Sequence, residues 1–109
     1  MHSVSVYQSF FVTYLENQII LKEPRNLYDP IQYILSLGGK RMRPVLTLMS
    51  AEIFEVSYEK ALPAAMAVEV FHNFSLVHDD IMDAAPLRRG NVTVHEKWDT
   101  NTGILSGDA

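Results

Sequence analysis

The fold is decided by the stretch from Glu69 to Asp83, which reads EVFHNFSLVHDDIMD. The residues just before it, from Pro63 to Val68, are almost wholly apolar. Together they predict one helix over residues 63–83, which at 1.5 Å per residue would be about 30 Å long. This helix would be apolar on nearly every side, and such a helix belongs in the interior of a protein rather than on its surface.

One narrow polar line runs along the predicted helix. Its members are three or four residues apart, so that they lie one above another on a single face. They are Glu69, His72, Ser75, Asp79 and Asp83. A face that meets solvent would be broader and would carry lysine, so this line predicts a face that lines a cavity.

Three carboxylates, Asp79, Asp80 and Asp83, stand together at the end of this helix. Like charges repel one another, burial disfavours ionisation, and the C-terminal end of a helix disfavours anions. A bound cation would reverse all three effects. Magnesium fits best, because it takes oxygen ligands and binds through one or two carboxylates together with substrate phosphates. Manganese is the alternative ion. An acidic helix end that is simply solvated is the competing interpretation.

The composition describes one small domain with a substantial core. The chain has 109 residues, of which 48% are hydrophobic, and carries a formal net charge of −4. This charge argues against general nucleic-acid binding. There is no cysteine, which excludes disulfides and thiolate chemistry. We expect a cytoplasmic protein, because the N-terminus lacks the pattern of a signal peptide and no apolar run is long enough to span a membrane.

The remaining segments also predict helices, so the expected fold class is all-α. Apolar residues recur at helical spacing, Pro24 and the pair Gly38-Gly39 end two segments, and Pro44 opens a third. Residues 84–91 predict a loop because they contain Pro, Gly and Asn, and residues 100–102 offer N-cap side chains. We expect a single helical bundle with helices over residues 3–22, 27–37, 44–54, 63–83, 93–98 and 102–109.

Two basic segments flank the acidic one. The first is GGKRMRP, residues 38–44, and the second is Arg88-Arg89-Gly90. Paired glycines let the backbone approach a ligand closely, and a helix N-terminus offers free N–H groups to an anion. Lys40 and Arg43 add full charges. A basic turn by itself is usually only solvated, but an acidic metal site flanked by cations predicts diphosphate recognition, in which arginine and magnesium share the phosphate oxygens.

Several motifs occur in an order and at a spacing typical of one known family. They are Gly38-Gly39-Lys40-Arg41-x-Arg43-Pro44, His72 seven residues before Asp79-Asp80-x-x-Asp83, Leu87-Arg88-Arg89-Gly90, and Thr93-Val94-His95 with Gly107-Asp108-Ala109. From about Leu27 onward the chain resembles the trans-isoprenyl diphosphate synthases, that is, the farnesyl and geranylgeranyl diphosphate synthases and their relatives. The resemblance implies the N-terminal part of an isoprenoid-synthase-type helical fold.

The resemblance also implies a role for each matching residue. Asp79, Asp80 and Asp83 look like the first aspartate-rich motif, which holds the allylic diphosphate through magnesium ions, and Arg88 is similar to the arginine that contacts the same diphosphate. The residues that look like the isopentenyl diphosphate site are Lys40, Arg43, His72 and Arg89. In the implied reaction the allylic carbon–oxygen bond ionises, the metals and arginine stabilise the departing diphosphate, and the isopentenyl double bond attacks the allylic cation.

Two aromatic residues bear on the length of the product. Phe74 lies five residues before Asp79, and Phe71 lies one turn further back. In the family that the chain resembles, a bulky residue here forms the floor of a tunnel and limits chain length, which implies products of about fifteen to twenty carbons. The competing interpretation is that both rings belong to the ordinary core.

The chain departs from the family in its length. Members of the family are much longer and carry a second aspartate-rich motif on a later helix, and no residue here can replace that motif. We therefore expect the N-terminal portion of a synthase, which is inactive alone and self-associates because it exposes apolar surface. The family generally forms dimers, so the resemblance implies a homodimer.

Two other functions are compatible with parts of the sequence. A His-Asp metal phosphohydrolase could use His72, His78, Asp79 and a fourth ligand such as His95, although the pattern lacks a second histidine-rich helix. A shortened relative could also act as a non-catalytic helical interaction module. Magnesium-dependent binding of a diphosphate would separate both from a synthase.

Overall fold

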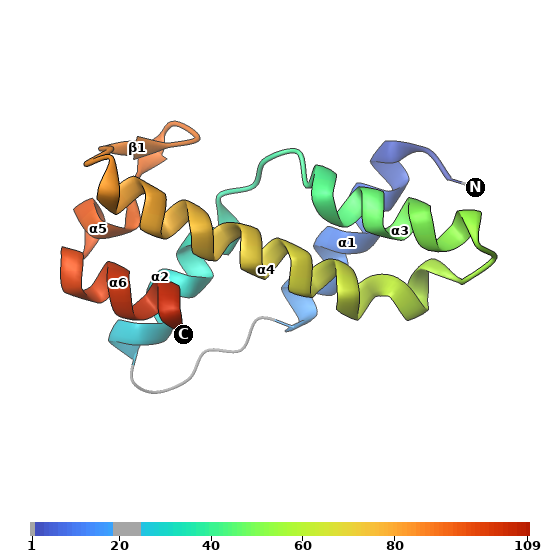
Figure 1. The fold of residues 1–109 in the computed structure, drawn as a ribbon, viewed down its shortest axis with the longest axis horizontal. Coiled ribbons are helices and arrows are strands. Elements are labelled where there is room, and N and C mark those ends of the chain that lie inside the picture. The colour runs from blue at the N-terminus through green and yellow to red at the C-terminus, as the bar shows by residue number, and fades with distance from the viewer. Residues whose placement is uncertain (1, 19–24) are drawn as a thin grey trace. The chain divides into compact units, whose positions relative to one another are not determined.

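The structure is a computed structural model that describes residues 2–18 and 25–109. Within these ranges the chain forms six α-helices and one small β-hairpin, which confirms the predicted all-α class (Figure 1). No helix in these ranges combines the length and the apolar character needed to cross a membrane. The predicted end of the first helix at residue 22 lies outside the described residues. The elements are α1 (Val4–Gln18), α2 (Arg25–Ser36), α3 (Met42–Ile53), α4 (Tyr58–Met82), β1 (Leu87–Arg88), β2 (Asn91–Val92), α5 (Val94–Lys97) and α6 (Thr100–Asp108).

The segment over residues 84–91, predicted as a loop, contains the first strand and the turn of the hairpin, which corrects the sequence interpretation. Strands β1 and β2 pair antiparallel, with Leu87 opposite Val92. The two turn residues, Arg89 and Gly90, both have positive φ values, 53° and 76°, as a type I′ hairpin turn requires. Strands of two residues are too short to show an alternating pattern in the sequence.

Helix α4 begins at Tyr58, earlier than the predicted start at Pro63. Proline has no N–H, so the carbonyl of Glu59 loses its helical partner at this point. Glu59 and Pro63 are both exposed, so water can bond to that carbonyl and the helix continues through the proline. The helix then runs to Met82.

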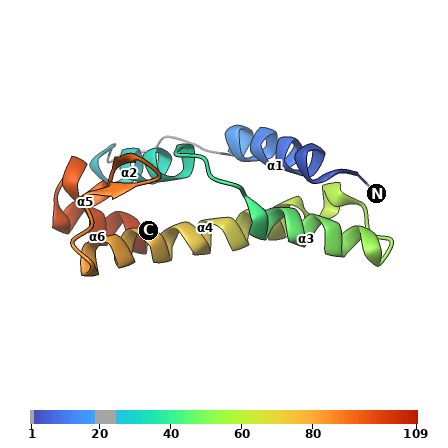
Figure 2. The same cartoon turned by 90° about the horizontal axis from the view of Figure 1, so that it is seen from above.

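The chain divides into two compact units, and α4 contributes residues to both. The described part of the first unit covers residues 2–18 and 40–70. In this unit α1 lies alongside α3 and packs on it (Figure 2). Burial of apolar side chains from both helices removes them from water and stabilises the unit. The buried side chains include Tyr7, Phe11, Leu15, Val45 and Leu48.

The described part of the second unit covers residues 25–39 and 71–109. Here α2, α5 and α6 pack on one another (Figures 1 and 2). The hydroxyl of Ser106 donates a hydrogen bond of 2.9 Å to the carbonyl of Leu27, which ties α6 to α2. This unit carries the acidic end of α4 and the hairpin.

Helix α6 begins at a cap that the sequence interpretation missed. The predicted cap lay among residues 100–102, but the cap is Asp99. Its carboxylate accepts a hydrogen bond of 2.7 Å from the N–H of Thr102. An aspartate at this position satisfies one of the free N–H groups that every helix start presents.

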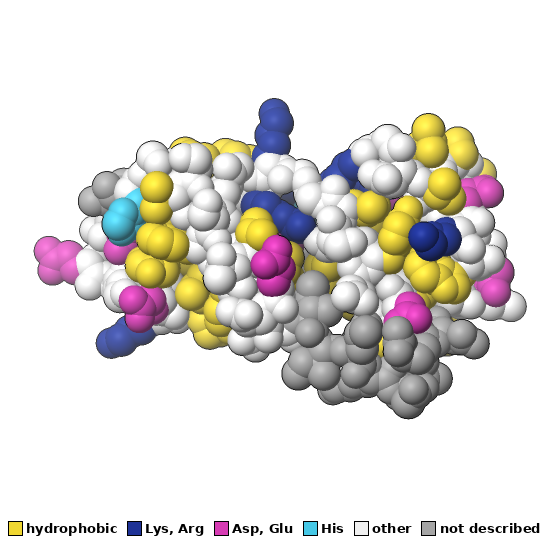
Figure 3. All heavy atoms as spheres, turned by 180° about the vertical axis from the view of Figure 1, so that it is seen from behind, with side chains coloured by type: hydrophobic (Ala, Val, Ile, Leu, Met, Phe, Trp, Pro, Cys, Tyr) yellow, Lys and Arg dark blue, Asp and Glu magenta, His cyan; other side chains and the backbone are white. Residues whose placement is uncertain are grey.

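Both units expose large apolar side chains. Figure 3 shows hydrophobic side chains on one face of the protein, interspersed with charged ones. Exposed apolar area of this kind favours contact with further protein, in line with the expected self-association, which stays a prediction. The most exposed examples are Leu46, Ile53 and Phe54 in the first unit and Phe71, Met82 and Leu105 in the second.

Candidate functional site

The acidic cluster at the end of α4 is not uniform. Asp79 and Asp83 are exposed, whereas Asp80 is only 3% exposed. Asp79 and Asp83 are one helical turn apart, and the N–H of Asp83 still donates to the carbonyl of Asp79 at 2.9 Å. The sequence interpretation treats the three carboxylates alike, but the structure gives them two different environments.

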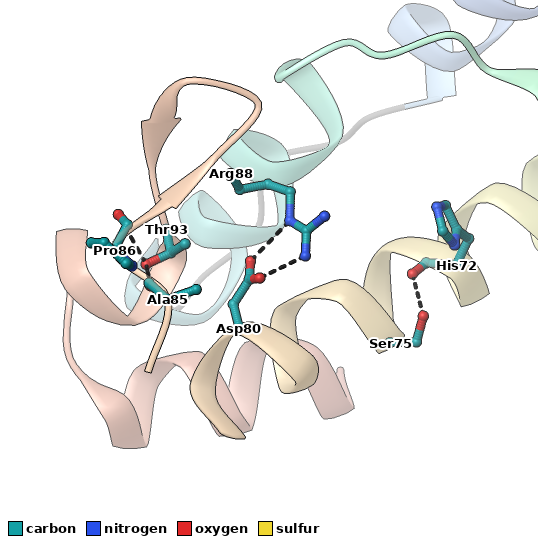
Figure 4. A network of polar contacts seen from close by, with 7 residues as sticks. All are labelled: His72, Ser75, Asp80, Ala85, Pro86, Arg88 and Thr93. Carbon is teal, nitrogen blue, oxygen red and sulfur yellow. Dashed lines mark hydrogen bonds and ion pairs between the residues drawn. The ribbon is translucent and has the colours of Figure 1, made fainter. Parts of the chain in front are cut away.

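Asp80 forms a two-point ion pair with Arg88 of strand β1 (Figure 4). Arg88 Nη2 donates to one carboxylate oxygen at 2.6 Å, and Nε donates to the other at 3.1 Å. The bond to Asp80 raises the pKa of the Arg88 guanidinium, and the charges of Asp79 and Asp83 raise it further. Arg88 therefore stays cationic beside two exposed carboxylates, with 28% of its side chain exposed.

A chain reversal after α4 brings Arg88 to Asp80. Ala84 has a positive φ of 51°, and the N–H of Ala85 donates to the carbonyl of Asp80 at 2.9 Å. This is the Schellman arrangement, in which a left-handed residue ends a helix. The hydroxyl of Thr93 then donates to the carbonyl of Ala85 at 2.8 Å and secures the base of the hairpin (Figure 4).

The two exposed carboxylates, Asp79 and Asp83, are the candidates in this cluster for holding a divalent cation. Both carboxylate oxygens of Asp80 accept hydrogen bonds from Arg88. Asp79 and Asp83 are exposed, so these two acids are the ones that an ion in solvent can reach. Within the described residues no group of three or more His, Asp or Glu side chains is arranged to hold a metal. Two carboxylates are compatible with magnesium, because this ion binds through one or two of them and takes its other ligands from water and phosphate.

The four residues that resemble an isopentenyl diphosphate site fall into two pairs. In the first unit Lys40 and Arg43 are exposed, and the carbonyl of Lys40 accepts a hydrogen bond of 2.6 Å from Gln8. In the second unit His72 is half-buried on α4, and Arg89 occupies the exposed hairpin turn. That these four side chains surround one ligand stays a prediction from the sequence.

Two members of the predicted polar line bond within the protein rather than facing a cavity. Glu69 accepts a hydrogen bond of 2.9 Å from Arg41, and the two side chains are 3% and 6% exposed. The hydroxyl of Ser75 donates to the carbonyl of His72 at 2.6 Å (Figure 4). A buried carboxylate is normally paired with a cation. The presence of Glu69 on an apolar helix could therefore have predicted a basic partner, and Arg41, to which the sequence interpretation assigned no role, is that partner.

The aromatic residues Phe71 and Phe74 are not part of the core of the described chain. Phe71 is 69% exposed and Phe74 is 36% exposed, and their ring centroids are 5.7 Å apart. The ring of Phe74 meets His78 edge-on, with centroids 4.6 Å apart. Nε2 of His78 lies 3.3 Å from the carbonyl oxygen of Ile104, so this histidine packs between Phe74 and α6.

Residues 24–109 match the family model described as polyprenyl synthetase. The chain belongs to this family. It is 50% identical over 94 residues to a geranylgeranyl pyrophosphate synthase of Geoglobus acetivorans, in an alignment that covers 86% of this chain and 30% of that protein. It is 43% identical over 94 residues to a geranylgeranyl diphosphate synthase of Methanosarcina mazei, covering 86% of this chain and 29% of that protein.

The fold of this polyprenyl synthetase family member matches that of a solved relative. The crystal structure of a geranylgeranyl pyrophosphate synthase superposes on it with a TM-score of 0.96 at 58% identity, covering 99% of this chain and 33% of that chain. The predicted isoprenoid-synthase-type helical fold is therefore confirmed. The chain spans about a third of the length of the relatives that it matches.

Family membership and geometry both weaken the phosphohydrolase interpretation. His78 packs against α6, and the side chain of His95 is 9% exposed, with Nε2 3.7 Å from Glu96. Neither histidine joins Asp79 in a metal-binding group within the part of the chain that the structure describes.

Proposed function

We propose that this chain forms the allylic diphosphate-binding part of an isoprenyl diphosphate synthase, a magnesium-dependent prenyltransferase. Its substrates are isopentenyl diphosphate and an allylic diphosphate. The observation that carries the proposal is the ion pair of Asp80 with Arg88, which holds a guanidinium beside the exposed carboxylates of Asp79 and Asp83. The names of the two archaeal relatives support the same reaction.

Arg88 has donors to spare for the allylic diphosphate. A guanidinium carries five N–H groups, and Arg88 directs Nε and one N–H of Nη2 at Asp80. Its remaining donors would bind a diphosphate oxygen, and Asp79 and Asp83 would hold the magnesium ion. Magnesium, when bound, neutralises the charge that develops on the departing diphosphate. Arg88 adds a fixed positive charge to the same stabilisation.

The second substrate, isopentenyl diphosphate, is bound in this proposal by charge-assisted hydrogen bonds. Its double bond attacks the allylic cation, and a proton then leaves the new carbon chain. The residues proposed to bind its diphosphate are Lys40, Arg43, His72 and Arg89.

The proposed product has about fifteen to twenty carbons. Phe71 and Phe74 expose their rings, so both can meet an apolar prenyl tail, which the hydrophobic effect favours. The products named for the archaeal relatives are geranylgeranyl compounds, in agreement with this range.

We also propose a homodimeric assembly, because Phe54 and Met82 are 80% and 77% exposed. Light scattering that gives a monomer at every concentration would contradict the assembly.

Calorimetric titration of geranyl diphosphate into the chain, with and without magnesium, tests the proposed function. We expect binding that requires magnesium and is lost in Asp79→Asn. Glu16→Gln removes an exposed carboxylate of α1 in the first unit and is the control that binds like wild type. Binding that ignores magnesium, or that survives in Asp79→Asn, contradicts the synthase and favours a non-catalytic module. Release of inorganic phosphate from geranyl diphosphate in the titrated sample favours the phosphohydrolase.

A further inference from the structure

Gly39 and Arg89 approach each other closely. A Cβ atom built on Gly39 would lie 3.0 Å from Cζ and Nε of Arg89 and 3.2 Å from Nη2, whereas an ordinary van der Waals contact is 3.4–4 Å. Both residues belong to the second unit, so the contact lies within one compact body. No side chain fits at position 39 unless Arg89 moves.

The guanidinium of Arg89 turns its flat face toward Gly39. Its central carbon is as close to the missing Cβ as Nε is, and an edge-on approach would bring the nitrogens much closer than the carbon. The N–H donors of a guanidinium lie in its plane. The contact with Gly39 therefore lies against the face of the guanidinium and involves none of its N–H donors.

Both partners lie on backbone with positive φ. Gly38 and Gly39 have φ values of 86° and 101°, a region that is open to glycine and rarely adopted by other residues. Arg89 has a φ of 53° in the hairpin turn. Close to that turn, the hydroxyl of Tyr33 donates to the carbonyl of Val92 at 2.5 Å. The contact thus joins the segment after α2 to the turn of the hairpin.

We propose that Gly39 is a positioning residue for Arg89. Because it has no side chain, it gives the guanidinium a backbone surface that holds it in the orientation needed to bind a diphosphate. This inference rests on the proposed function, in which Arg89 binds isopentenyl diphosphate. An arginine that is already held loses less rotamer freedom when it binds phosphate, so Gly39 raises the affinity without touching the ligand.

Gly39→Ala and Gly38→Ala form a matched pair of variants. Both place alanine at a positive φ and so carry similar backbone strain, but a Cβ at Gly38 meets nothing within 4 Å. Titration of isopentenyl diphosphate in magnesium-free buffer measures the basic site alone. We expect Gly39→Ala to weaken binding about tenfold and Gly38→Ala no more than about twofold, since one misplaced charge-assisted hydrogen bond has roughly this effect. In an Arg89→Ala background the two glycine variants should bind equally.

The order of the Arg89 side chain gives a readout that needs no ligand. Nitrogen relaxation of its Nε–H group, assigned by its loss in Arg89→Ala, reports picosecond to nanosecond mobility. We expect the same order in wild type and in Gly38→Ala, and measurably lower order in Gly39→Ala. Unchanged order in Gly39→Ala overturns the positioning role. If wild type and Arg89→Ala bind the ligand equally, the proposed function fails at Arg89, and the relaxation result still decides the role of Gly39.

Discussion

Asp80 and Arg88 are bonded at two points, and the pair joins the last turn of α4 to strand β1. This bond divides three identical side chains into two roles. Asp80 holds an arginine in place, while Asp79 and Asp83 face solvent, where an ion and a phosphate can reach them. One acid of the motif, Asp80, therefore holds the Arg88 guanidinium next to the other two acids.

Replacing Asp80 by asparagine tests the supporting role. Asparagine cannot accept two charge-assisted bonds from Arg88, so we expect the free energy of unfolding to fall by about 1–3 kcal/mol. Urea denaturation measures this change. Asp79→Asn is the matched control, because Asp79 is exposed one residue away, and it should stay within about 0.5 kcal/mol of wild type.

Asp80→Asn should lose more stability than Asp79→Asn, but Asp79→Asn should lose more of the magnesium-dependent binding of geranyl diphosphate. Asp79→Asn removes a proposed magnesium ligand, so the magnesium-dependent binding of geranyl diphosphate should be lost. Asp80→Asn keeps both solvent-facing acids and should retain that magnesium effect, with weaker binding because Arg88 is less well oriented. If both variants lose stability and magnesium dependence to the same extent, the division of roles is wrong.

The helices could be predicted because their signals are local. Apolar spacing and the prolines and glycines at segment ends require no knowledge of distant residues. The end of α4 was predicted to within one residue, but the hairpin and the left-handed chain reversal that follows the helix were not predicted, for a related reason. Their left-handed positions are occupied by Arg89 and Ala84, where the usual signal is glycine or asparagine.

The site could be predicted only as a set of candidate residues. Type and spacing identify the acids and the cations, but the choice of Asp80 rather than Asp79 as the partner of Arg88 depends on the chain reversal after α4. The bond between Arg41 and Glu69 joins residues far apart in the sequence. Such pairings depend on tertiary packing, which one sequence does not encode in any local pattern.

The buried pair of Arg41 and Glu69 leads to a second stability prediction. Glu69→Gln leaves a guanidinium that is 6% exposed without its carboxylate partner, and loss of one member of a buried ion pair typically costs about 3–5 kcal/mol. Glu59→Gln removes an exposed carboxylate from the first turn of the same helix and should change stability by less than about 0.5 kcal/mol. Urea denaturation compares the two variants.

A double variant separates charge from packing at this pair. Arg41→Met with Glu69→Leu removes both charges and keeps apolar bulk, so it should recover much of the stability that Glu69→Gln loses, because apolar replacements of buried ion pairs are often neutral. Equal stability of Glu69→Gln and wild type would show that the pair contributes nothing.

The cap of α6 predicts a dependence of stability on pH. The N–H of Thr102 donates to the Asp99 carboxylate and lowers the pKa of that group in the folded chain. A lowered folded-state pKa contributes stability above the unfolded-state pKa of about 3.9, and this contribution disappears as the pH falls through the lower folded value. Asp99→Asn keeps a capping side chain that does not titrate. Its thermal midpoint should approach that of wild type as the pH falls below about 4, and Asp99→Ala should unfold earliest at neutral pH.

Phe74 offers a test of product length. The test needs a complete synthase, which a chimera supplies when this chain replaces the matching segment of the Geoglobus acetivorans relative, to which it is 50% identical. In the proposed function the growing prenyl chain meets the exposed ring of Phe74, so Phe74→Ala should shift the products to longer chains on reversed-phase chromatography. Phe54→Ala removes a ring that is 80% exposed in the first unit and should leave the products unchanged.

The outcome of the Phe74 test depends on what supports the ring. Phe74 is 36% exposed and contacts His78, which is placed by the carbonyl of Ile104. His78→Ala should therefore lengthen the products as well, though less than Phe74→Ala, because the ring remains but loses its neighbour. Unchanged products in Phe74→Ala would show that this ring does not limit the chain. If only His78→Ala gives longer products, the product length is limited by His78 and the adjacent helix α6 rather than by the ring of Phe74.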